Sequence, residues 1–342
     1  MTRNPHRADE VQAFIHAQDW QDATQLPLAG DASNRKYIRL IAGEKRAIVM
    51  DAAPEVGENV EPFFRIAGHL AGVGLSAPAI CAQDMDRGLL LIEDLGDDLF
   101  STVTARAPER ERDLYLAATD TLIALHAAPP PPAPDYGTAT MTEVAGLAHD
   151  WYFFGATGTR DGDARQAMQA RLSDAFARLD PWTPVLVLRD YHAENLLWLP
   201  DRTAPANVGL LDFQDGGLGH PAYDLMSLAR DVRRAVSPET TNAMIAHYAR
   251  ETGTDPEGFS AACSTVSAQR NLRILGVFAR LSLHYGKPHY VDLIPRTWAN
   301  LLTDLAHPSL AHLRDQVRAT LPEPTPETLA LLKEKCGTVP TR

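Results

Sequence analysis

Short apolar runs separated by turn residues dominate the first quarter of the chain. The runs are Tyr37 to Leu40, Ala47 to Met50, Pro78 to Cys81 and Leu89 to Glu93. Such runs, bounded by turn residues as at Asp86-Arg87-Gly88, predict the strands of a small antiparallel sheet. A segment from about Asn59 to Gly72 has apolar residues at helical spacing, so we expect one helix to pack on that sheet.

Beyond Asp94 the hydrophobic pattern changes to a spacing of three to four residues, which predicts helices. The segments are Glu109 to His126, Ala164 to Leu179, Tyr223 to Arg234, Pro238 to Glu251 and Ser260 to His284. We therefore expect two lobes: a sheet-rich one over residues 1–94 and a larger, mainly helical one over residues 95–342. Prolines at 129–134 predict a stiff connector, with a partner-docking motif as the alternative, and the Pro- and Glu-rich end from Pro322 predicts a loosely held tail.

Composition narrows the classes of function. The 342 residues carry a formal net charge of −12, which argues against a dedicated nucleic-acid surface. Three widely separated cysteines suggest neither a disulfide framework nor a zinc cluster. No apolar stretch is long enough for a signal peptide or a membrane span, so we expect a cytoplasmic protein without a membrane partner. The sequence does not indicate the oligomeric state.

The most informative chemistry lies in residues 185–216. An apolar strand there leads to Asp190, Asn195 follows five residues later, and a second apolar run leads to Asp212 and an aromatic residue. Phosphoryl transfer needs a carboxylate to orient the attacking hydroxyl, and an amide and a second carboxylate to hold Mg²⁺ on the phosphates. The alternative is that these three residues only cap turns, as Asp and Asn often do.

These motifs resemble those of the aminoglycoside-phosphotransferase-like kinases. The resemblance rests on Leu188-Arg-Asp-Tyr-His-Ala-Glu-Asn195, Leu211-Asp-Phe213 and Gly219-His-Pro-Ala-Tyr-Asp-Leu225. It implies an α+β, protein-kinase-like two-lobe fold, with a small antiparallel-sheet N-lobe, a larger helical C-lobe, and ATP and Mg²⁺ as cofactors. It further assigns roles to individual residues: Asp190 as catalytic base, Asn195 and Asp212 as metal ligands, Asp224 as a brace of the catalytic loop, and His192 as a structural imidazole or a phosphate contact.

Two departures from the family pattern leave a catalytically silent pseudokinase as an alternative. Leu188 replaces a bracing histidine, and Met50 stands where these kinases place the lysine that grips the α and β phosphates. Arg35 is the candidate substitute cation, and strand alternation places it on one face with Tyr37 and Arg39. Its hairpin, 28–39, occupies the position of the nucleotide-covering loop. We assign nucleotide binding to Arg35 and Tyr37, with a solvated hairpin charge as the alternative for Arg35, and the resemblance assigns it to the hinge residues Glu93 and Leu95. Glu58 and Glu61 are weak candidates for the acid that pairs the cation, because both lie at a predicted helix start where a solvated role is favoured.

Several segments are more similar to one branch of the family, the anomeric N-acetylmuramate and N-acetylglucosamine kinases of cell-wall recycling. They include Gly30 to Arg39, Leu90 to Asp97, Tyr223 to Asp231 and Gln269 to Leu281. That branch also lacks the lysine, which favours an active enzyme. The resemblance implies phosphorylation of the anomeric hydroxyl to give a sugar 1-phosphate.

Binding of the small-molecule sugar needs aromatic and cationic side chains. Trp151 and Tyr152 are of the right kind for stacking on a sugar ring, although such residues are often core. Arg230, Arg233 and Arg270 are candidates for a lactyl carboxylate, against a default role at the surface or in bracing a helix. Kinases of another small alcohol, such as an aminoglycoside, choline or homoserine, remain an alternative, because a fold does not decide its substrate.

Overall fold

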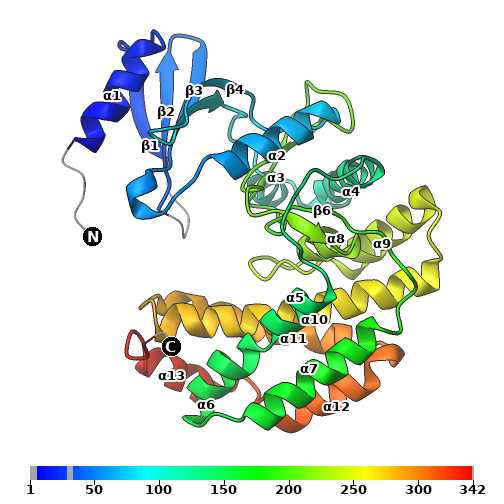
Figure 1. Cartoon of the computed structure of the whole chain (residues 1–342). Coiled ribbons are helices and arrows are strands. Elements are labelled where there is room, and N and C mark those ends of the chain that lie inside the picture. The colour runs from blue at the N-terminus through cyan, green and yellow to red at the C-terminus, as the bar shows by residue number, and fades with distance from the viewer. Residues whose placement is uncertain (1–5, 29–33, 341–342) are drawn as a thin grey trace. The chain divides into compact units, whose positions relative to one another are not determined.

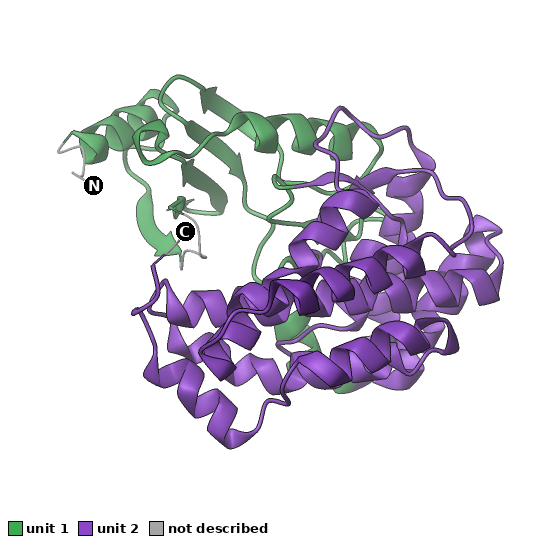
Figure 2. Ribbon diagram, turned by 60° about the horizontal axis from the view of Figure 1, so that its bottom comes forward, with its two compact units in different colours: residues 1–108, 193–215 green, residues 109–192, 216–342 purple. Residues whose placement is uncertain are grey.

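A computed structural model describes residues 6–28 and 34–340 of the chain. The chain divides into two compact units, coloured separately in Figure 2. Unit 1 comprises residues 1–108 and 193–215, and unit 2 comprises residues 109–192 and 216–342. The segment 193–215, which the sequence analysis assigned to the second lobe, therefore belongs with the N-terminal residues.

An antiparallel sheet of five strands forms the frame of unit 1 (Figure 1). The strands are β1 (Thr24–Leu28), β2 (Lys36–Ala42), β3 (Lys45–Asp51), β4 (Ile80–Asp84) and β5 (Leu89–Glu93), in the spatial order β1-β2-β3-β5-β4. The four predicted strands are present as β2, β3, β4 and β5. Strand β5 has the predicted bounds, and the other three differ from the prediction by a few residues at their ends. In the β2–β3 register Tyr37 lies opposite Met50, so the position that lacks a lysine is next to a tyrosine on the neighbouring strand.

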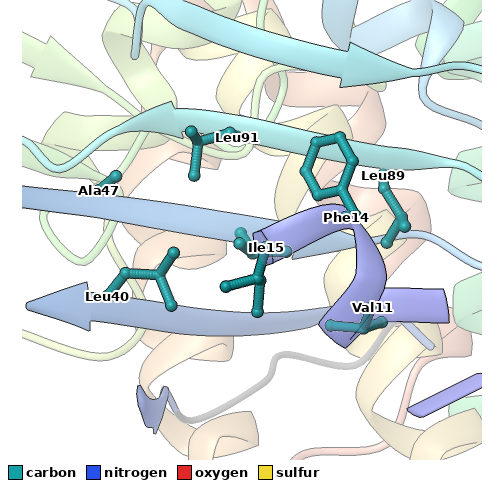
Figure 3. Close-up of a cluster of buried hydrophobic side chains, with 8 residues drawn as sticks. Val11, Phe14, Ile15, Leu40, Ala47, Leu89 and Leu91 are labelled. Atoms are coloured by element: carbon teal, nitrogen blue, oxygen red, sulfur yellow. The ribbon is translucent and has the colours of Figure 1, made fainter. Parts of the chain in front are cut away.

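A helix that the sequence analysis did not predict covers part of this sheet. Helix α1 (Arg7–Ala17) places apolar side chains against strands β2, β3 and β5, as Figure 3 shows. The cluster consists of Val11, Phe14, Ile15, Leu40, Ala47, Val49, Leu89 and Leu91. Arg7 fixes the start of the helix, because its Nε donates to Asp51 Oδ1 at the end of β3 over 2.9 Å.

A later strand pair completes unit 1. Strands β7 (Leu196–Trp198) and β8 (Val208–Leu210) pair with each other, and helices α2 (Glu61–Gly72) and α3 (Phe100–Arg106) precede them in the chain. The Trp198 N–H donates to the Asp98 carbonyl and the Leu210 N–H to the Ser76 carbonyl, each over 2.8 Å. These long-range backbone bonds explain why residues 193–215 belong with the N-terminal part.

Helices make up most of unit 2. They are α4 (Glu111–Ala127), α5 (Thr138–Ala145), α6 (Phe154–Thr157), α7 (Gly162–Phe176), α8 (Ala222–Ala229), α9 (Pro238–Thr252), α10 (Pro256–Leu283), α11 (Ile294–Leu305), α12 (Ala311–Thr320) and α13 (Pro326–Glu334). The π-helical segment is η3 (Ala148–Phe153), and the 3₁₀ segments are η2 (Pro108–Arg110), η4 (Pro288–Leu293) and η5 (Pro308–Leu310), with η1 (Pro54–Val56) in unit 1. Strands β6 (Val185–Val187) and β9 (Gly217–Gly219) pair antiparallel. Across the described residues, no helix has the length and hydrophobicity needed to cross a bilayer.

The prediction of a loosely held C-terminal tail is wrong. Helix α13 buries Leu332 completely. Ser282 Oγ donates to the Leu332 carbonyl over 2.9 Å, and Lys335 Nζ donates to the Gly155 carbonyl over 2.8 Å. Thr325 accepts from the Thr328 N–H as the N-cap, and Pro326 follows at the first helical position. These start signals outweigh the proline content that suggested a tail.

We expect Leu332→Ala to lower the free energy of unfolding by about 2–5 kcal/mol, because the change removes a fully buried leucine and leaves a cavity. The neighbouring Leu331 is 37% exposed, so Leu331→Ala should cost no more than about 0.5 kcal/mol. Urea unfolding followed by circular dichroism measures both variants. Equal, small effects would show that α13 does not contribute to the folded core.

Candidate active site

The loop that carries Asp190 is held by a buried carboxylate. Strand β6 leads into Leu188 and Arg189, and Arg189 adopts a left-handed backbone with φ of +72°. Asp224 on α8 has no exposed surface, and its two oxygens accept the N–H groups of Leu188 over 2.5 Å and Arg189 over 2.9 Å. These two bonds fix the backbone immediately before Asp190.

Opposing effects act on the Asp224 carboxyl. Burial raises the pKa of Asp224 to about 7, whereas the N–H donors of Leu188 and Arg189 and the charge of Arg270 favour its ionised form. On the other side of Asp190, the Tyr191 hydroxyl donates to the Ala118 carbonyl over 2.8 Å. The loop is therefore attached to α8 before Asp190 and to α4 after it.

His192 lies two residues beyond Asp190 and is 6% exposed. Burial, together with the charges of Arg233 and Arg270, lowers the pKa of His192 to about 3. The imidazole is consequently neutral over the physiological pH range, so it is a hydrogen-bonding group here and not a cation.

The second pair of predicted residues meets in unit 1. Because Leu196 pairs with Leu210 in the β7–β8 register, the residues just outside the strands, Asn195 and Leu211, also adjoin. The Leu211 N–H donates to the Asn195 carbonyl over 3.0 Å, and Asp212 follows with φ of +54°. The short hairpin thus brings Asn195 and Asp212 to the same end of the strand pair.

Neighbouring side chains hold Asp212 in this conformation. Gln214 is 5% exposed, and its Nε2 donates to Asp212 Oδ1 over 2.5 Å. Phe213 is fully buried and stacks on Phe63 of α2, with ring centroids 4.9 Å apart. The aromatic residue after Asp212 therefore anchors the loop in the core of unit 1, and the carboxylate is left at the surface of a cavity.

This cavity, of about 340 Å³, lies entirely within unit 1. Its apolar walls include Ile48, Phe63, Ile92, Leu197 and Leu211, and its polar lining includes Tyr37, Glu93, Glu194, Asn195 and Asp212. Leu95 lines the cavity as well. An apolar slot with a few oxygen ligands suits a flat heterocycle joined to an anionic group. The structure therefore brings five of the predicted site residues together: Tyr37, Glu93, Leu95, Asn195 and Asp212.

The segment after β5 is clamped by an arginine whose role the sequence analysis did not predict. Arg39 Nη1 donates to Asp97 over 2.8 Å, and its Nη2 donates to Asp94 over 2.9 Å and to the Gly96 carbonyl over 3.3 Å. The guanidinium thereby ties β2 to the hinge that lines the cavity. The only sequence signal was the shared strand face of Arg39 and Tyr37.

Arg35 forms an ion pair with Glu58, with 2.8 Å between its Nε and Oε2; both side chains are 12% exposed. The other Glu58 oxygen accepts the Asn34 N–H over 3.0 Å. Burial raises the pKa of Tyr37, and Arg35 and Asp212 are among the charges that act on its hydroxyl. Arg35 therefore lies near the polar lining of the cavity. Residues 29–33 of the same hairpin lie outside the described residues.

Met50, in contrast, is 1% exposed and packs in the core of unit 1. Glu61, the other acid considered as a partner for the cation, forms a more exposed pair with Arg65, with 3.2 Å between Oε1 and Nε. Of these two acids, Glu58 is thus the one that the structure pairs with Arg35.

The residues predicted to contact a sugar have different surroundings in unit 2. Trp151 is partly exposed and lies near His284, with ring centroids 6.2 Å apart. Tyr152 has no exposed surface, and its hydroxyl donates to the Pro322 carbonyl over 2.8 Å. This burial excludes direct contact between Tyr152 and a substrate, so the expectation for Tyr152 is corrected. Arg230 pairs with the buried Asp304, with 3.2 Å between Nε and Oδ1.

The donor set of the unit 1 cavity fits Mg²⁺. A carboxylate and an amide are hard oxygen ligands, and Mg²⁺ typically takes one or two carboxylates together with phosphates and waters. Among the described residues, no group of three or more His, Cys, Asp or Glu is arranged to hold a metal. The arrangement is thus unlike an all-protein metal cage and like a site completed by a phosphorylated ligand.

Comparison with known proteins agrees with this geometry. A curated relative from Caulobacter vibrioides, named N-acetylmuramate/N-acetylglucosamine kinase, is 38% identical and aligns over 92% of this chain and 96% of its own length. A relative of the same name from Pseudomonas aeruginosa is 32% identical over 90% of this chain and 92% of its own. The solved structure of the ADP-bound aminoglycoside phosphotransferase APH(2'')-Ib superposes with a TM-score of 0.59 at 14% identity, covering 91% of this chain and 99% of that one.

These likenesses confirm the predicted α+β kinase fold and the predicted family. The profile of the phosphotransferase enzyme family matches residues 24–260, which contain Asp190, Asn195 and Asp212. The match covers more than half of the chain and includes both the sheet of unit 1 and the loop of Asp190. The chain therefore belongs to the phosphotransferase enzyme family.

Proposed function

We propose that this enzyme is an ATP-dependent kinase that phosphorylates the anomeric hydroxyl of N-acetylmuramate or N-acetylglucosamine to give the sugar 1-phosphate. The observation that carries the proposal is the near full-length similarity to kinases named for these two sugars, at 38% and 32% identity. The two alignments cover 92% and 90% of this chain. The product assignment follows from the resemblance to anomeric kinases.

The cavity of unit 1 supports ATP as the phosphoryl donor. Its apolar walls suit an adenine ring, and the neighbouring backbone of Glu93 and Leu95 offers polar groups of the kind that read a base edge. A structural relative with 14% identity holds ADP. Tyr37 stands at the polar lining, on the side of the cavity where Arg35 lies.

Asn195 and Asp212 are the residues that would hold Mg²⁺. When bound, the ion neutralises phosphate charge and so lowers the cost of bringing an anionic donor and an oxygen nucleophile together. The chain's own contribution is to fix the two ligands. The β7–β8 register places Asn195 beside Leu211, the residue before Asp212, and the Gln214 side chain donates a hydrogen bond to Asp212.

Asp190 serves as base and orienter of the sugar hydroxyl. The sugar O1 forms a bond to the γ-phosphorus, the bond from that phosphorus to the bridging oxygen of ADP breaks, and the O1 proton passes to the Asp190 carboxylate. An anomeric hydroxyl is more acidic than an ordinary alcohol, so a carboxylate suffices and positioning supplies most of the acceleration. The bonds from Leu188 and Arg189 to Asp224 provide that positioning.

The ion pair of Arg35 and Glu58 takes over the task of the absent strand lysine. Arginine presents a planar fork of donors that matches phosphate oxygens. Glu58 holds Nε of this fork over 2.8 Å, which orients the remaining guanidinium nitrogens. A partly buried pair of this kind limits the side-chain entropy lost when the phosphates bind.

The product identifies the reaction. With ATP and Mg²⁺, we expect turnover of N-acetylmuramate and N-acetylglucosamine, and ³¹P NMR should show a phosphate coupled to the anomeric proton. Methyl glycosides of the same sugars, whose O1 is blocked, should be inert. Phosphorylation of a methyl glycoside would contradict the anomeric assignment. Turnover of kanamycin, choline or homoserine alone would show that the substrate belongs to another class. Nucleotide binding without turnover of any of these compounds would identify a pseudokinase.

Asp190→Asn should lower kcat by about 10²–10⁴-fold, because the amide cannot accept the proton. KM for ATP should change little, since Asp190 does not line the nucleotide cavity. Asp201→Asn makes the same chemical change at an exposed turn and serves as the matched control. Steady-state kinetics with a coupled ADP assay measure all three enzymes, and full activity of Asp190→Asn would exclude the base role.

Arg35→Gln should raise KM for ATP by about 10–150-fold, the usual weight of a hydrogen bond to a charged group. Lys36→Gln removes a charge from the adjacent exposed residue, whose side chain lies on the other strand face, and should leave KM for ATP almost unchanged. Glu58→Gln, which frees the guanidinium, should have an intermediate effect. Equal KM values for the Arg35 and Lys36 variants would show that Arg35 does not bind phosphate.

A further inference from the structure

Arg270, on α10 of unit 2, is a buried cation whose guanidinium is not neutralised by a hydrogen-bonded acid. The residue is 6% exposed, and among the described residues neither its Nε nor its Nη1 has a hydrogen-bond partner. Burying a guanidinium without a bonded anion is unfavourable, because the charge loses its hydration and gains no compensating contact. Such a residue is expected where a ligand supplies the anion.

Arg230, another arginine considered for a substrate carboxylate, differs from Arg270. Arg230 is paired with Asp304, whose other oxygen accepts from Ser267 and Asn271. Arg273, one turn further along α10, interacts with the Tyr223 hydroxyl and with the charge of Asp190.

The charge of Arg270 acts on the Asp224 carboxyl, but this acid has other hydrogen-bond partners. Both Asp224 oxygens accept backbone N–H groups, from Leu188 and from Arg189. Asp224 therefore offsets part of the charge of Arg270 from a distance without forming a bonded pair with it.

Arg270 also lies beside the loop of the catalytic base. Its charge acts on His192, two residues after Asp190, and on Asp224, which holds the residues before Asp190. Residues three apart on a helix share one face, so Arg270 and Arg273 present two cations from α10 toward this loop. An anionic group on a sugar whose O1 is oriented by Asp190 would come near these cations.

We propose that Arg270 binds the lactyl carboxylate of N-acetylmuramate and thereby sets the preference of the enzyme between its two sugars. The inference rests on the proposed function. N-acetylmuramate differs from N-acetylglucosamine by a lactyl ether that ends in a carboxylate, and a guanidinium is the side chain best matched to a carboxylate. Arg270 is then a specificity-determining residue, and the substrate carboxylate is the anion that pairs with its guanidinium.

The test compares kcat/KM for the two sugars in the wild-type enzyme and in Arg270→Gln. We expect kcat/KM for N-acetylmuramate to fall by about 10–150-fold, as for loss of a charged hydrogen bond, and that for N-acetylglucosamine to remain nearly constant. The ratio of the two values is the decisive quantity, because any loss of correctly folded enzyme cancels from it.

Two further variants complete the design. Arg270→Lys keeps the charge and loses the fork, so it should restore part of the preference for N-acetylmuramate. Arg280→Gln is the matched control: it removes the same group from the same helix about 15 Å further along its axis, at a partly exposed position, and should leave the ratio unchanged.

The outcomes separate the inference from the function on which it rests. An equal loss for both sugars would show that Arg270 only stabilises the loop around Asp224. Unchanged kcat/KM values for both sugars would show that Arg270 binds no carboxylate. Either result overturns the inference while the sugar kinase stands. A wild-type enzyme that accepts N-acetylglucosamine but not N-acetylmuramate has the same meaning. A wild-type enzyme that accepts neither sugar refutes the proposed function and the inference together.

Discussion

The carboxylate of Asp224 is the group on which the backbone geometry of the loop before Asp190 depends. Its oxygens accept the N–H groups of Leu188 and Arg189, in a stretch where Arg189 adopts a positive φ. A non-glycine residue in the left-handed region costs energy and persists only where its surroundings enforce it. A buried carboxylate is itself costly unless hydrogen-bonded. Each cost is offset by the same two bonds, so the loop conformation and the burial of Asp224 require one another.

In unit 1, backbone pairing between strands fixes the positions of Asn195 and Asp212. The register of the short strands β7 and β8 adjoins Asn195 to Leu211, and the stacking of Phe213 on Phe63 fixes the residue after Asp212 in the core. Asp212 also has a positive φ. The loop of the predicted base and the loop of the predicted metal ligand thus each contain a non-glycine residue at positive φ that is held by buried neighbours. The boundary between the units falls between His192 and Ala193, within the motif itself. The motif therefore supplies Asp190 to one unit and Asn195 to the other, and each unit fixes its own residue independently.

The sequence predicted the elements with strong periodicity and the residues with a characteristic spacing. Strands β2, β3, β4 and β5 and the long helices fall in this group. The roles of Asp190, Asn195 and Asp212 stay predictions; Asn195 and Asp212 line the same cavity. The sequence did not predict α1, because this helix has few apolar residues and their common face becomes evident only where it packs on the sheet. It also did not predict that Leu332 anchors α13 in the core. Tyr152 shows why some residues are misassigned from sequence. A run of aromatic residues can line a pocket or fill a core, and the residue types do not distinguish the two. Ion pairs between distant residues, such as Arg35 with Glu58, depend on strand register, which residue types do not reveal.

The position of that ion pair bears on how a kinase fold can lack its strand lysine. Met50 is buried, so a lysine there would have to displace apolar packing or extend from the core toward the cavity. Strand β2 lies beside β3, with Lys36 opposite Asp51, and Arg35 is the next residue outward. A cation at that point stands beyond the end of β3, where Glu58 can reach it from the loop before α2. In the proposed function, Arg35, just before the neighbouring strand, supplies the cation in place of the lysine. Met50 then keeps the core position apolar, and the forked arginine side chain offers its donors to phosphate oxygens.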